Sequence, residues 1–543
     1  MRDEVRQILG CLMICFPSYI QDLKKNSFRR AISDELRAYY IGCVKSAMAL
    51  MQANAGLKAF LDGLMRFVQG ISRPTDVGLL DIFYRLLSFE PFRGYLQANV
   101  KENVLKNRAA RNLSELSRLI KKFCFLHNMH SLNPDNKNAM PEELFNIYLK
   151  FLYIDGIGEY EDEAEAAPGG CVSFMTIHQS KGLEFPVVVV GSLGNVPRRS
   201  RDTLMFAAES RFFHRPPFEP LADIRYFDFW RLYYVAFSRA QNLLILAMKK
   251  EAGKYFSAFT ERLPGLEKLK TGRAFARVRP ARFKHIYSFT SHLSVYEGCP
   301  TQYKYYKEYA FAQNQMLHTS VGSLVHATLE DMNKCVIEGQ PEFVTEEKIR
   351  QWFVLNYHSM TEQTGYDLTE EQQENALQQV IRYYRHRKDE LGRVWKAEEE
   401  INLVLPEYIL QGVIDLVEGE GDTVEIVDYK TGPKPEIADH PERVEHYRKQ
   451  LEIYAYLIEK RYGKKVRRMH LYYTSTLTGD PIISFDWSRE AVDRTVAEIS
   501  RIVRKIENKD FEQGAQNTYA CRFCDLRFVC GKAPVTLGGL LQN

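Results

Sequence analysis

Apolar residues recur every three or four positions through roughly the first 160 residues of the chain. This spacing is typical of amphipathic helices. It is clearest in three runs, Asp34–Leu50, Leu57–Val68 and Leu113–Leu126. The strict apolar–polar alternation of a half-buried strand is nearly absent there. We therefore predict that this region is mostly helical.

The pattern changes near residue 171, where short apolar runs replace the helical spacing. We predict strands at Val172–Met175, Pro186–Val190 and Leu243–Ala247. The second run is an almost continuous series of valines, typical of a buried strand in a parallel sheet. These runs indicate an α/β lobe, and the preceding helical region would be a large insertion in it.

A second α/β unit follows from about Tyr287. Its predicted helices are Gly322–Cys335, Glu370–Glu390 and Val444–Tyr462, and its predicted strands are Glu399–Val404, Tyr408–Glu418 and Thr423–Lys430. Between residues 267 and 284 lies a stretch rich in lysine and arginine. It is either a solvated linker or a track for a DNA backbone.

Composition places the chain among ordinary globular proteins. It has 543 residues, 45% of them hydrophobic, and a formal net charge of +4, so several domains are expected and the charge alone does not decide whether it binds nucleic acid. Asp3 and Glu4 stand where a signal peptide has positive charge, and no apolar run has the length of a membrane span. We expect a cytoplasmic protein that is not bound to a membrane, whose ten cysteines form no structural disulfides.

Candidate chemistry lies on a predicted hairpin of the second α/β unit. Asp415 falls in its first strand, and Asp428 and Lys430 fall in its second. Side chains alternate across a strand, so Asp428 and Lys430 should point to one face and Tyr429 to the other. Two carboxylates can hold a hard divalent ion, and a lysine beside them can serve an attacking water.

Further polar residues accompany this hairpin. His326 opens a predicted amphipathic helix, Gly412 precedes Asp415 by three residues, and Gln450 and Tyr454 share one face of a later helix. Together these residues resemble the RecB-like branch of the PD-(D/E)xK nuclease superfamily over about Tyr287 to Lys532. The resemblance implies a restriction-endonuclease-like α/β domain that cleaves DNA with Mg²⁺ or Mn²⁺.

The resemblance also implies a role for each residue of the pattern. His326, Asp415 and Asp428 would be metal ligands, with the carbonyl of Tyr429 as a further candidate. Lys430 would position or activate the water. Gln450 and Tyr454 would support the catalytic site and contact DNA.

Four cysteines form a second constellation. Cys521, Cys524 and Cys530 follow the spacing C-x2-C-x5-C, and Cys299 lies far upstream. Four thiolates suit either zinc or an iron–sulfur cluster, and the spacing alone does not separate the two. Resemblance to AddB-type nucleases, which carry one cysteine before the nuclease core and three after it, favours a 4Fe-4S cluster. The other six cysteines are predicted to be buried small hydrophobic residues.

The first α/β lobe resembles part of another family. The runs Thr176–Phe185 and Arg231–Ala240 resemble two late motifs of UvrD-like superfamily 1 helicases. By that resemblance Gly182 and Glu184 would face a nucleotide, Arg239 would act as an arginine finger, and His178 would face DNA or the cleft between lobes. A lobe that keeps only the fold of a motor is the alternative.

No Gly-x4-Gly-Lys-Ser/Thr phosphate loop occurs in the sequence. The chain should therefore use ATP only if a first motor lobe is supplied in trans, by a helicase subunit that carries the missing loop. The first nine residues resemble a segment that follows a mid-helicase motif, so we expect a truncated or split helicase.

The predicted fold class is α/β, with an incomplete RecA-like helicase lobe followed by the nuclease domain. We divide the chain into a helical insertion (1–165), the motor lobe (166–265), a basic linker (266–286) and the nuclease domain (287–543). The leading hypothesis is a deoxyribonuclease that acts on single strands or duplex ends in DNA repair, recombination or end processing. The rivals are a non-catalytic DNA-binding or scaffold subunit and a helicase completed in trans.

Overall fold

The computed structural model describes residues 2–97, 100, 104–151, 172–178, 180–181, 183–197, 211, 223–248, 253–265, 284–314, 317–364, 367–438, 440–515, 521 and 524–532. The chain divides into two compact units, one made of 1–161 together with 284–543 and the other of 162–283. Most of the basic stretch between residues 267 and 284, and Cys171, lie outside the described residues. In the described part of the chain, no helix combines the length and hydropathy needed to cross a membrane.

The N-terminal region is helical, as its apolar spacing predicts. The predicted runs fall within α3 (Asp34–Ala53), α4 (Ala55–Gly70) and α7 (Val104–Leu126). The remaining helices are α1 (Asp3–Ile14), α2 (Pro17–Lys25), α5 (Leu79–Leu86), α6 (Phe92–Gln97) and α8 (Ala139–Pro141), followed by a π-helix at Glu142–Tyr148.

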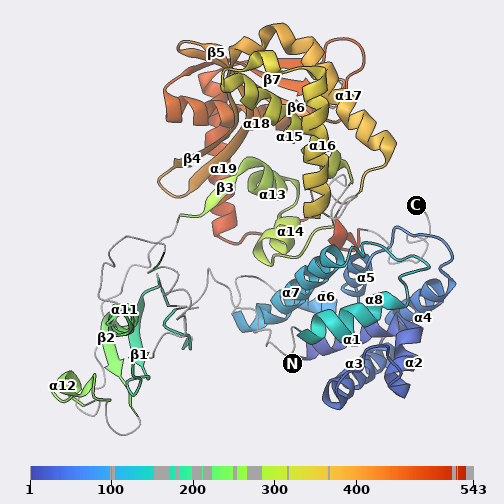
Figure 1. The fold of residues 1–543 in the computed structure, drawn as a ribbon, viewed down its shortest axis with the longest axis vertical. Helices are drawn as coiled ribbons and strands as arrows, with labels where there is room; N and C mark the ends of the chain where they lie inside the picture. Colours follow the sequence, from blue (N-terminus) through green and yellow to red (C-terminus); the bar gives the residue numbers. More distant parts are fainter. Residues whose placement is uncertain are drawn as a thin grey trace. The chain divides into compact units, whose positions relative to one another are not determined.

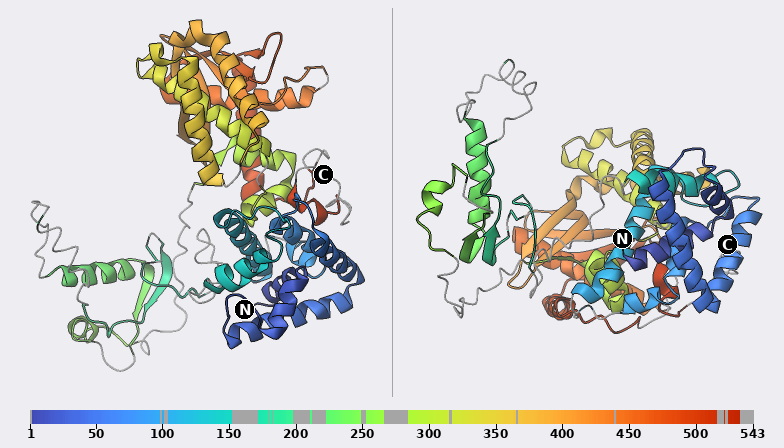
Figure 2. Two further views of the ribbon diagram at one scale, coloured as in Figure 1. Left: turned by 45° about the vertical axis from the view of Figure 1, so that its right-hand side comes forward. Right: turned by 90° about the horizontal axis from the view of Figure 1, so that it is seen from below.

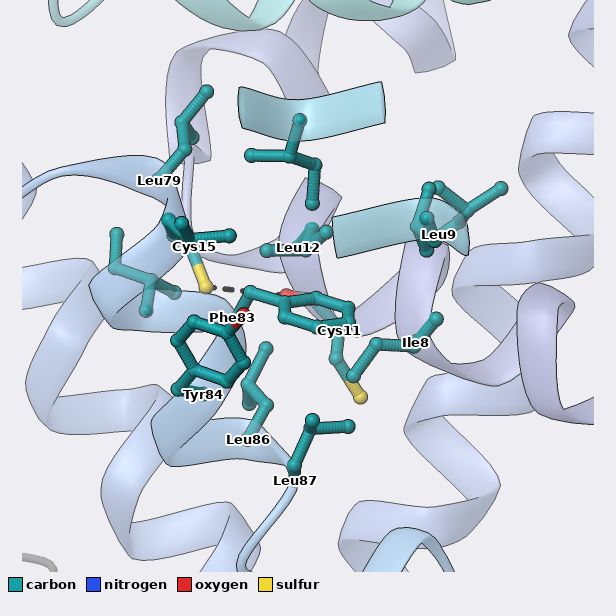
Figure 3. Packing of buried hydrophobic residues seen from close by; sticks show 14 of the residues in the cluster. Ile8, Leu9, Cys11, Leu12, Cys15, Leu79, Phe83, Tyr84, Leu86 and Leu87 are labelled. Atoms are coloured by element: carbon teal, nitrogen blue, oxygen red, sulfur yellow. Dashed lines mark hydrogen bonds between the residues drawn. The ribbon is translucent and has the colours of Figure 1, made fainter. Parts of the chain in front are cut away.

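Helix α1 lies in the centre of this region and contacts α3, α5 and α7. Its Cys11 and Cys15 pack among Phe83 and Leu86 of α5 (Figure 3), as expected for cysteines that act as small hydrophobic residues. Helices α1 and α3 approach so closely that a Cβ on Gly10 would lie 2.1 Å from the carbonyl oxygen of Cys43. Any larger residue there would force the two helices apart.

The smaller unit contains two parallel strands, β1 (Phe185–Val190) and β2 (Ala240–Leu246), with helix α11 (Ile224–Phe237) beside them (Figure 2). The predicted parallel pairing is confirmed. The expectation that the valine run is buried is wrong, because only Val190 of β1 is buried. The predicted strand at Val172–Met175 is also wrong, since these residues pair with no strand and Phe174 is 94% exposed.

The C-terminal half is built on a mixed sheet with the strand order β3-β5-β6-β7-β8, and β4 pairs with β5. The strands are β3 (Ile286–Ser288), β4 (Val394–Val404), β5 (Ile409–Glu420), β6 (Thr423–Lys430), β7 (Lys465–Tyr473) and β8 (Ile482–Asp486). Strands β5 and β6 form the predicted antiparallel hairpin. Strand β4 begins at Val394, five residues earlier than the sequence pattern predicts.

Helices cover both faces of this sheet (Figure 1). One apolar core joins it to α18 (Pro441–Tyr462) and α19 (Arg489–Glu507). The other joins it to α15 (Leu317–Ile337), α16 (Glu346–Thr364) and α17 (Glu370–Arg387). Helix α18 connects the parallel strands β6 and β7, the usual arrangement for a crossover between parallel strands. Short helices α13 (Ser294–Gly298) and α14 (Pro300–Tyr303) flank Cys299.

The C-terminal residues fold back onto the N-terminal helices. Cys524, Leu526 and Val529 belong to the helical core, together with Tyr305 and Tyr309 from the start of the C-terminal half. The 3-10 helix η8 (Asp525–Phe528) contacts α5, where the guanidinium of Arg85 lies 4.3 Å from the centre of the Phe528 ring. The helical region and the C-terminal half therefore share one apolar core.

A buried ion pair between α17 and the sheet provides a test of the fold. Arg387 donates to both oxygens of Glu418, each at 2.5 Å, and the Glu418 side chain is 3% exposed. Glu418→Ala would leave the buried guanidinium with the half-exposed Glu390, at 2.9 Å, as its remaining ion-pair partner among the described residues. We therefore expect a loss of about 3 kcal/mol in the free energy of unfolding, the low end for a broken buried pair. Urea unfolding followed by tryptophan fluorescence measures this loss.

The control is Glu346→Ala, which removes the partner of exposed Arg385 and should change the urea midpoint little. Equal effects of the two substitutions would contradict the assigned role of the buried pair.

Candidate metal centre and cysteine cavity

Two buried aspartates face each other across the hairpin. The β5–β6 register pairs Leu416 with Val427, which places Asp415 opposite Asp428. Asp415 is 9% and Asp428 3% exposed. Oδ2 of Asp415 accepts a hydrogen bond from the backbone N–H of Tyr429 at 2.7 Å, so this oxygen is fixed by the neighbouring strand. Like charges this close are costly to bury unless cations accompany them.

Lys430 supplies one of those cations. Its Nζ lies 2.6 Å from Oδ2 of Asp428 and 4.2 Å from the ring centre of Tyr447. The two side chains share a face, as strand alternation predicts, whereas Tyr429 points away and donates to Tyr383. Burial alone would lower the pKa of Lys430, but the Asp428 carboxylate raises it above its ordinary value. Burial raises the pKa of Asp428, although Lys430 opposes that shift.

Gln450 connects these groups to helix α18. Its Nε2 donates to Oδ1 of Asp428 at 3.0 Å and to the hydroxyl of Tyr454 at 2.8 Å, and its Oε1 accepts from Lys430 at 3.1 Å. The predicted helical spacing therefore brings both α18 residues to the aspartates. The helix can come this close because residue 412 is glycine, where a Cβ would lie 2.5 Å from Leu457 Cδ1.

His326 approaches the aspartates from α15. Its Nδ1 lies 3.6 Å from Oδ1 of Asp415 and 4.0 Å from Oε1 of Glu398 in β4. Ligand atoms of these three residues all lie within 4.8 Å of one another. Burial alone would lower the pKa of His326, but the Asp415 carboxylate raises it to about 9. Burial, and then the charge of Asp415, raise the pKa of Glu398 to about 7.

This donor set fits a divalent cation. An imidazole and carboxylate oxygens are suitable ligands for such an ion. The centre holds more carboxylates than Lys430 can balance, so an added cation would relieve their repulsion. The structure thus gathers all the residues predicted for the site, namely His326, Asp415, Asp428, Tyr429, Lys430, Gln450 and Tyr454.

Glu398 was missed by the sequence prediction. It stands first in a run of three glutamates, a pattern typical of the solvent-exposed end of a strand. The register between β4 and β5 could have identified it. The pairs Ala397–Leu416 and Glu399–Ile414 place Glu398 opposite Asp415.

The four predicted cysteines, Cys299, Cys521, Cys524 and Cys530, line one cavity with Arg527 and Lys532. Sγ of Cys299 accepts a hydrogen bond from the backbone N–H of Gln302 at 3.3 Å. Burial raises the pKa of the Cys299 and Cys524 thiols, so both are protonated at neutral pH unless a metal binds. Cys11, Cys15, Cys43, Cys124 and Cys335 are buried elsewhere, as predicted.

The helicase-like residues meet at the start of β1. Arg239 Nη1 donates to the carbonyl of Leu183 at 3.0 Å, and its own carbonyl accepts from the N–H of Phe185 at 2.8 Å. Glu184, between them, accepts from Gln241 at 3.0 Å. His178 is exposed, and Gly182 lies outside the described residues. Two of the predicted nucleotide residues thus lie at one end of the strand pair.

Comparison with known proteins finds a family match for each of two segments of the chain. Residues 290–531 match the PD-(D/E)XK nuclease superfamily, and residues 87–251 match the UvrD-like helicase C-terminal domain. A 64-residue segment is 42% identical to an ATP-dependent helicase/nuclease subunit from Pelotomaculum thermopropionicum. That match spans 12% of this chain and 5% of the relative.

Among solved structures, a protein described as an exonuclease from Eubacterium rectale aligns with 47% of this chain and 97% of its own length. The identity is 12% and the TM-score 0.29. An overlay this loose carries no weight for the fold.

The metal-free centre should lose stability as pH rises. The folded-state pKa of His326, about 9, exceeds its ordinary 6.5, and that of Glu398, about 7, exceeds 4.5. A group whose pKa is raised on folding stabilises the fold fully below its unfolded-state pKa and loses that contribution as pH passes the folded-state pKa. In a chelating buffer, the free energy of unfolding should therefore fall between about pH 5 and pH 9.

His326→Gln should remove roughly 1–2 kcal/mol of the fall above pH 6.5, less than the full shift because the side chain is 31% exposed. Urea midpoints at pH 6 and pH 9 measure this. Exposed His358 supplies the control, His358→Gln. An unaltered pH slope in His326→Gln would refute the assignment.

Proposed function

We propose that this chain is a divalent-metal-dependent deoxyribonuclease. The premise is that it joins a PD-(D/E)XK nuclease domain (290–531) to a UvrD-like helicase C-terminal domain (87–251). Its substrates are DNA single strands or duplex ends, and its role is DNA repair, recombination or end processing. The observation that carries this proposal is the buried Asp415–Asp428 pair with Lys430 beside it.

His326, Asp415, Asp428 and the carbonyl of Tyr429 would hold Mg²⁺ or Mn²⁺. When bound, such an ion polarises the phosphate and lowers the pKa of a coordinated water. The imidazole and oxygen donors of these residues, and the excess of carboxylates over the neighbouring cation Lys430, support this assignment. Asp415 is fixed by the Tyr429 N–H and Asp428 by Gln450, so both would be in place before substrate arrives.

Lys430 acts at the attacking side of the phosphodiester. Its ammonium, held between Asp428 and Gln450, orients a water and offsets negative charge that develops as the P–O bond breaks. Tyr447 covers this ammonium and limits its solvation, which strengthens the local field. Gln450 and Tyr454 are positioning residues, because they reach the reacting groups through Asp428 and Lys430.

The motor lobe requires a partner for ATP use. Glu184 and Arg239 lie together at the start of β1, and with Gly182 they would face a nucleotide held by a second lobe. His178 would contact DNA. A helicase subunit with a phosphate loop is the proposed partner, and the curated relative is itself named a helicase/nuclease subunit. Residues 1–165 would be the insertion of this lobe (166–265), and 266–286 the linker to the nuclease domain (287–543).

For the cysteine cavity we propose a 4Fe-4S cluster rather than zinc. Cys299 precedes the nuclease core and Cys521, Cys524 and Cys530 follow it, an order that resembles AddB-type nucleases, which bind such a cluster. The four cysteines line one cavity, and Arg527 and Lys532 beside them would balance the charge of the cluster.

Asp428→Asn and Lys430→Ala should each lower cleavage of end-labelled single-stranded DNA at least about 10²- to 10³-fold, while DNA binding in Ca²⁺ persists. The control is Lys434→Ala, because the Lys434 ammonium contacts backbone carbonyls away from the aspartates. DNA binding by the wild type without cleavage under any divalent metal would instead favour a scaffold role.

The anaerobically purified protein should carry iron and sulfide and show a broad absorption band in the blue. Cys524→Ser should remove the band, because it removes one of the four thiolates. The control Cys335→Ser changes a thiol that hydrogen-bonds the carbonyl of Gln340 and should leave the band unchanged. Stoichiometric zinc without iron would rule out the cluster.

A further inference from the structure

Helix α7 and the chain around Ala310 to Asn314 line a cavity of about 590 Å³, a volume within the usual range of ligand pockets, about 300–1,000 Å³. The described residues that line it include none from the metal centre or the cysteine cavity. They include three basic side chains of α7, Arg118, Lys121 and Lys122, and no carboxylate. A cavity of this size and charge suits an anion.

The basic residues share a face of α7 with an exposed aromatic ring. Lys121 and Lys122 are exposed, and Phe125, which is 38% exposed, follows them by four and three residues. This is the spacing of neighbours on a helix surface. Arg118, one turn earlier, pairs with Glu115 at 2.9 Å, an exposed pair that an anion can replace at little cost. Cations beside an exposed ring form the combination that binds a single strand, because phosphates contact the cations and a base stacks on the ring.

The opposite wall of the cavity is held in place by its own contacts. Ala310 has a φ of +59°, in the left-handed region that a residue with a Cβ seldom adopts. The bonds of the residues that follow it to α7 hold this conformation. The N–H of Ala312 donates to the hydroxyl of Ser117 at 3.0 Å, and Nζ of Lys121 donates to the carbonyl of Gln313 at 2.9 Å. Strained backbone that is fixed in this way is concentrated at functional sites.

The carboxylate of Asp81 does not cancel the positive charge of the cavity. Its Oδ2 accepts a hydrogen bond from the N–H of Gly78 at 2.9 Å, and its Oδ1 accepts from Nδ2 of Asn314 at 2.8 Å. Gly78 and Asn314 line the cavity, whereas Asp81 is not among the residues that line it. Asp81 thus fixes two lining residues and leaves the charge of the lysines directed at a ligand.

We propose that this cavity binds nucleotides of a DNA single strand, at a site separate from the metal centre. Lys121, Lys122 and Arg118 contact backbone phosphates, and a base stacks on Phe125. Residues 118–125 extend about 10 Å along the helix, a row that suits successive phosphates better than one free nucleotide. The site gives the strand a second attachment and so raises its local concentration at the metal centre. This role rests on the proposed function, since the strand is the proposed substrate.

The test is binding of a labelled oligothymidylate to the full chain in Ca²⁺, measured by fluorescence anisotropy at several salt concentrations. Phe125→Ala should weaken binding at least about 5-fold through lost stacking. Lys122→Ala should weaken it and lower the slope of log affinity against log salt by about 0.7. The controls Lys58→Ala and Phe343→Ala make the same changes at exposed residues outside the cavity and should bind like the wild type.

Cleavage kinetics and a free nucleotide separate the alternatives. In Mg²⁺ both cavity variants should raise KM for the strand and leave kcat unchanged, because they remove binding alone. If they bind and cleave like the controls, the inference is wrong and the proposed nuclease stands. Thymidine monophosphate that binds the cavity as tightly as the oligonucleotide would also overturn it. If the cavity variants lose DNA binding but the wild type cleaves nothing, the strand site stands and the proposed function fails.

Discussion

Repulsion between carboxylates that share a buried space is the constraint around which the nuclease half is organised. Asp415 and Asp428 face each other because the β5–β6 register allows no other placement. Their charges can stay buried only with cations and hydrogen-bond donors around them. The Tyr429 N–H, Lys430, Gln450 and His326 provide these, and each comes from an element whose position the two apolar cores fix.

Much of the fold followed from hydrophobic period alone. The long helices and the hairpin were predictable because each buries one continuous apolar stripe or alternating face. The prediction of a strand at Val172–Met175 was wrong because a short apolar run does not reveal whether a neighbouring strand exists to pair with it. The prediction that β1 is buried was wrong for a related reason, since the burial of a strand depends on helices or strands far away in the sequence that pack over it.

The candidate site was predictable where its residues repeat a pattern along the chain. Asp428 and Lys430 obey strand alternation, and Gln450 and Tyr454 obey helical spacing. Glu398 obeys neither, because its position depends on one backbone angle and on the register between two strands. A residue that follows neither strand alternation nor helical spacing can be recognised from the structure but not from the sequence pattern.

The shared core of the helical region and the C-terminal tail governs how this protein can be divided. Tyr305, Tyr306, Tyr309 and Phe311, just inside the C-terminal half, are buried together with residues of α1, α5 and α7. A fragment that begins at residue 284 would present these aromatic rings, and Leu526 and Val529, to water as one adjoining apolar surface. Such a fragment would self-associate, although its sheet, metal centre and cysteines were all present. The segment that matches the nuclease family is therefore shorter than the segment needed for a fragment that stays monomeric in solution.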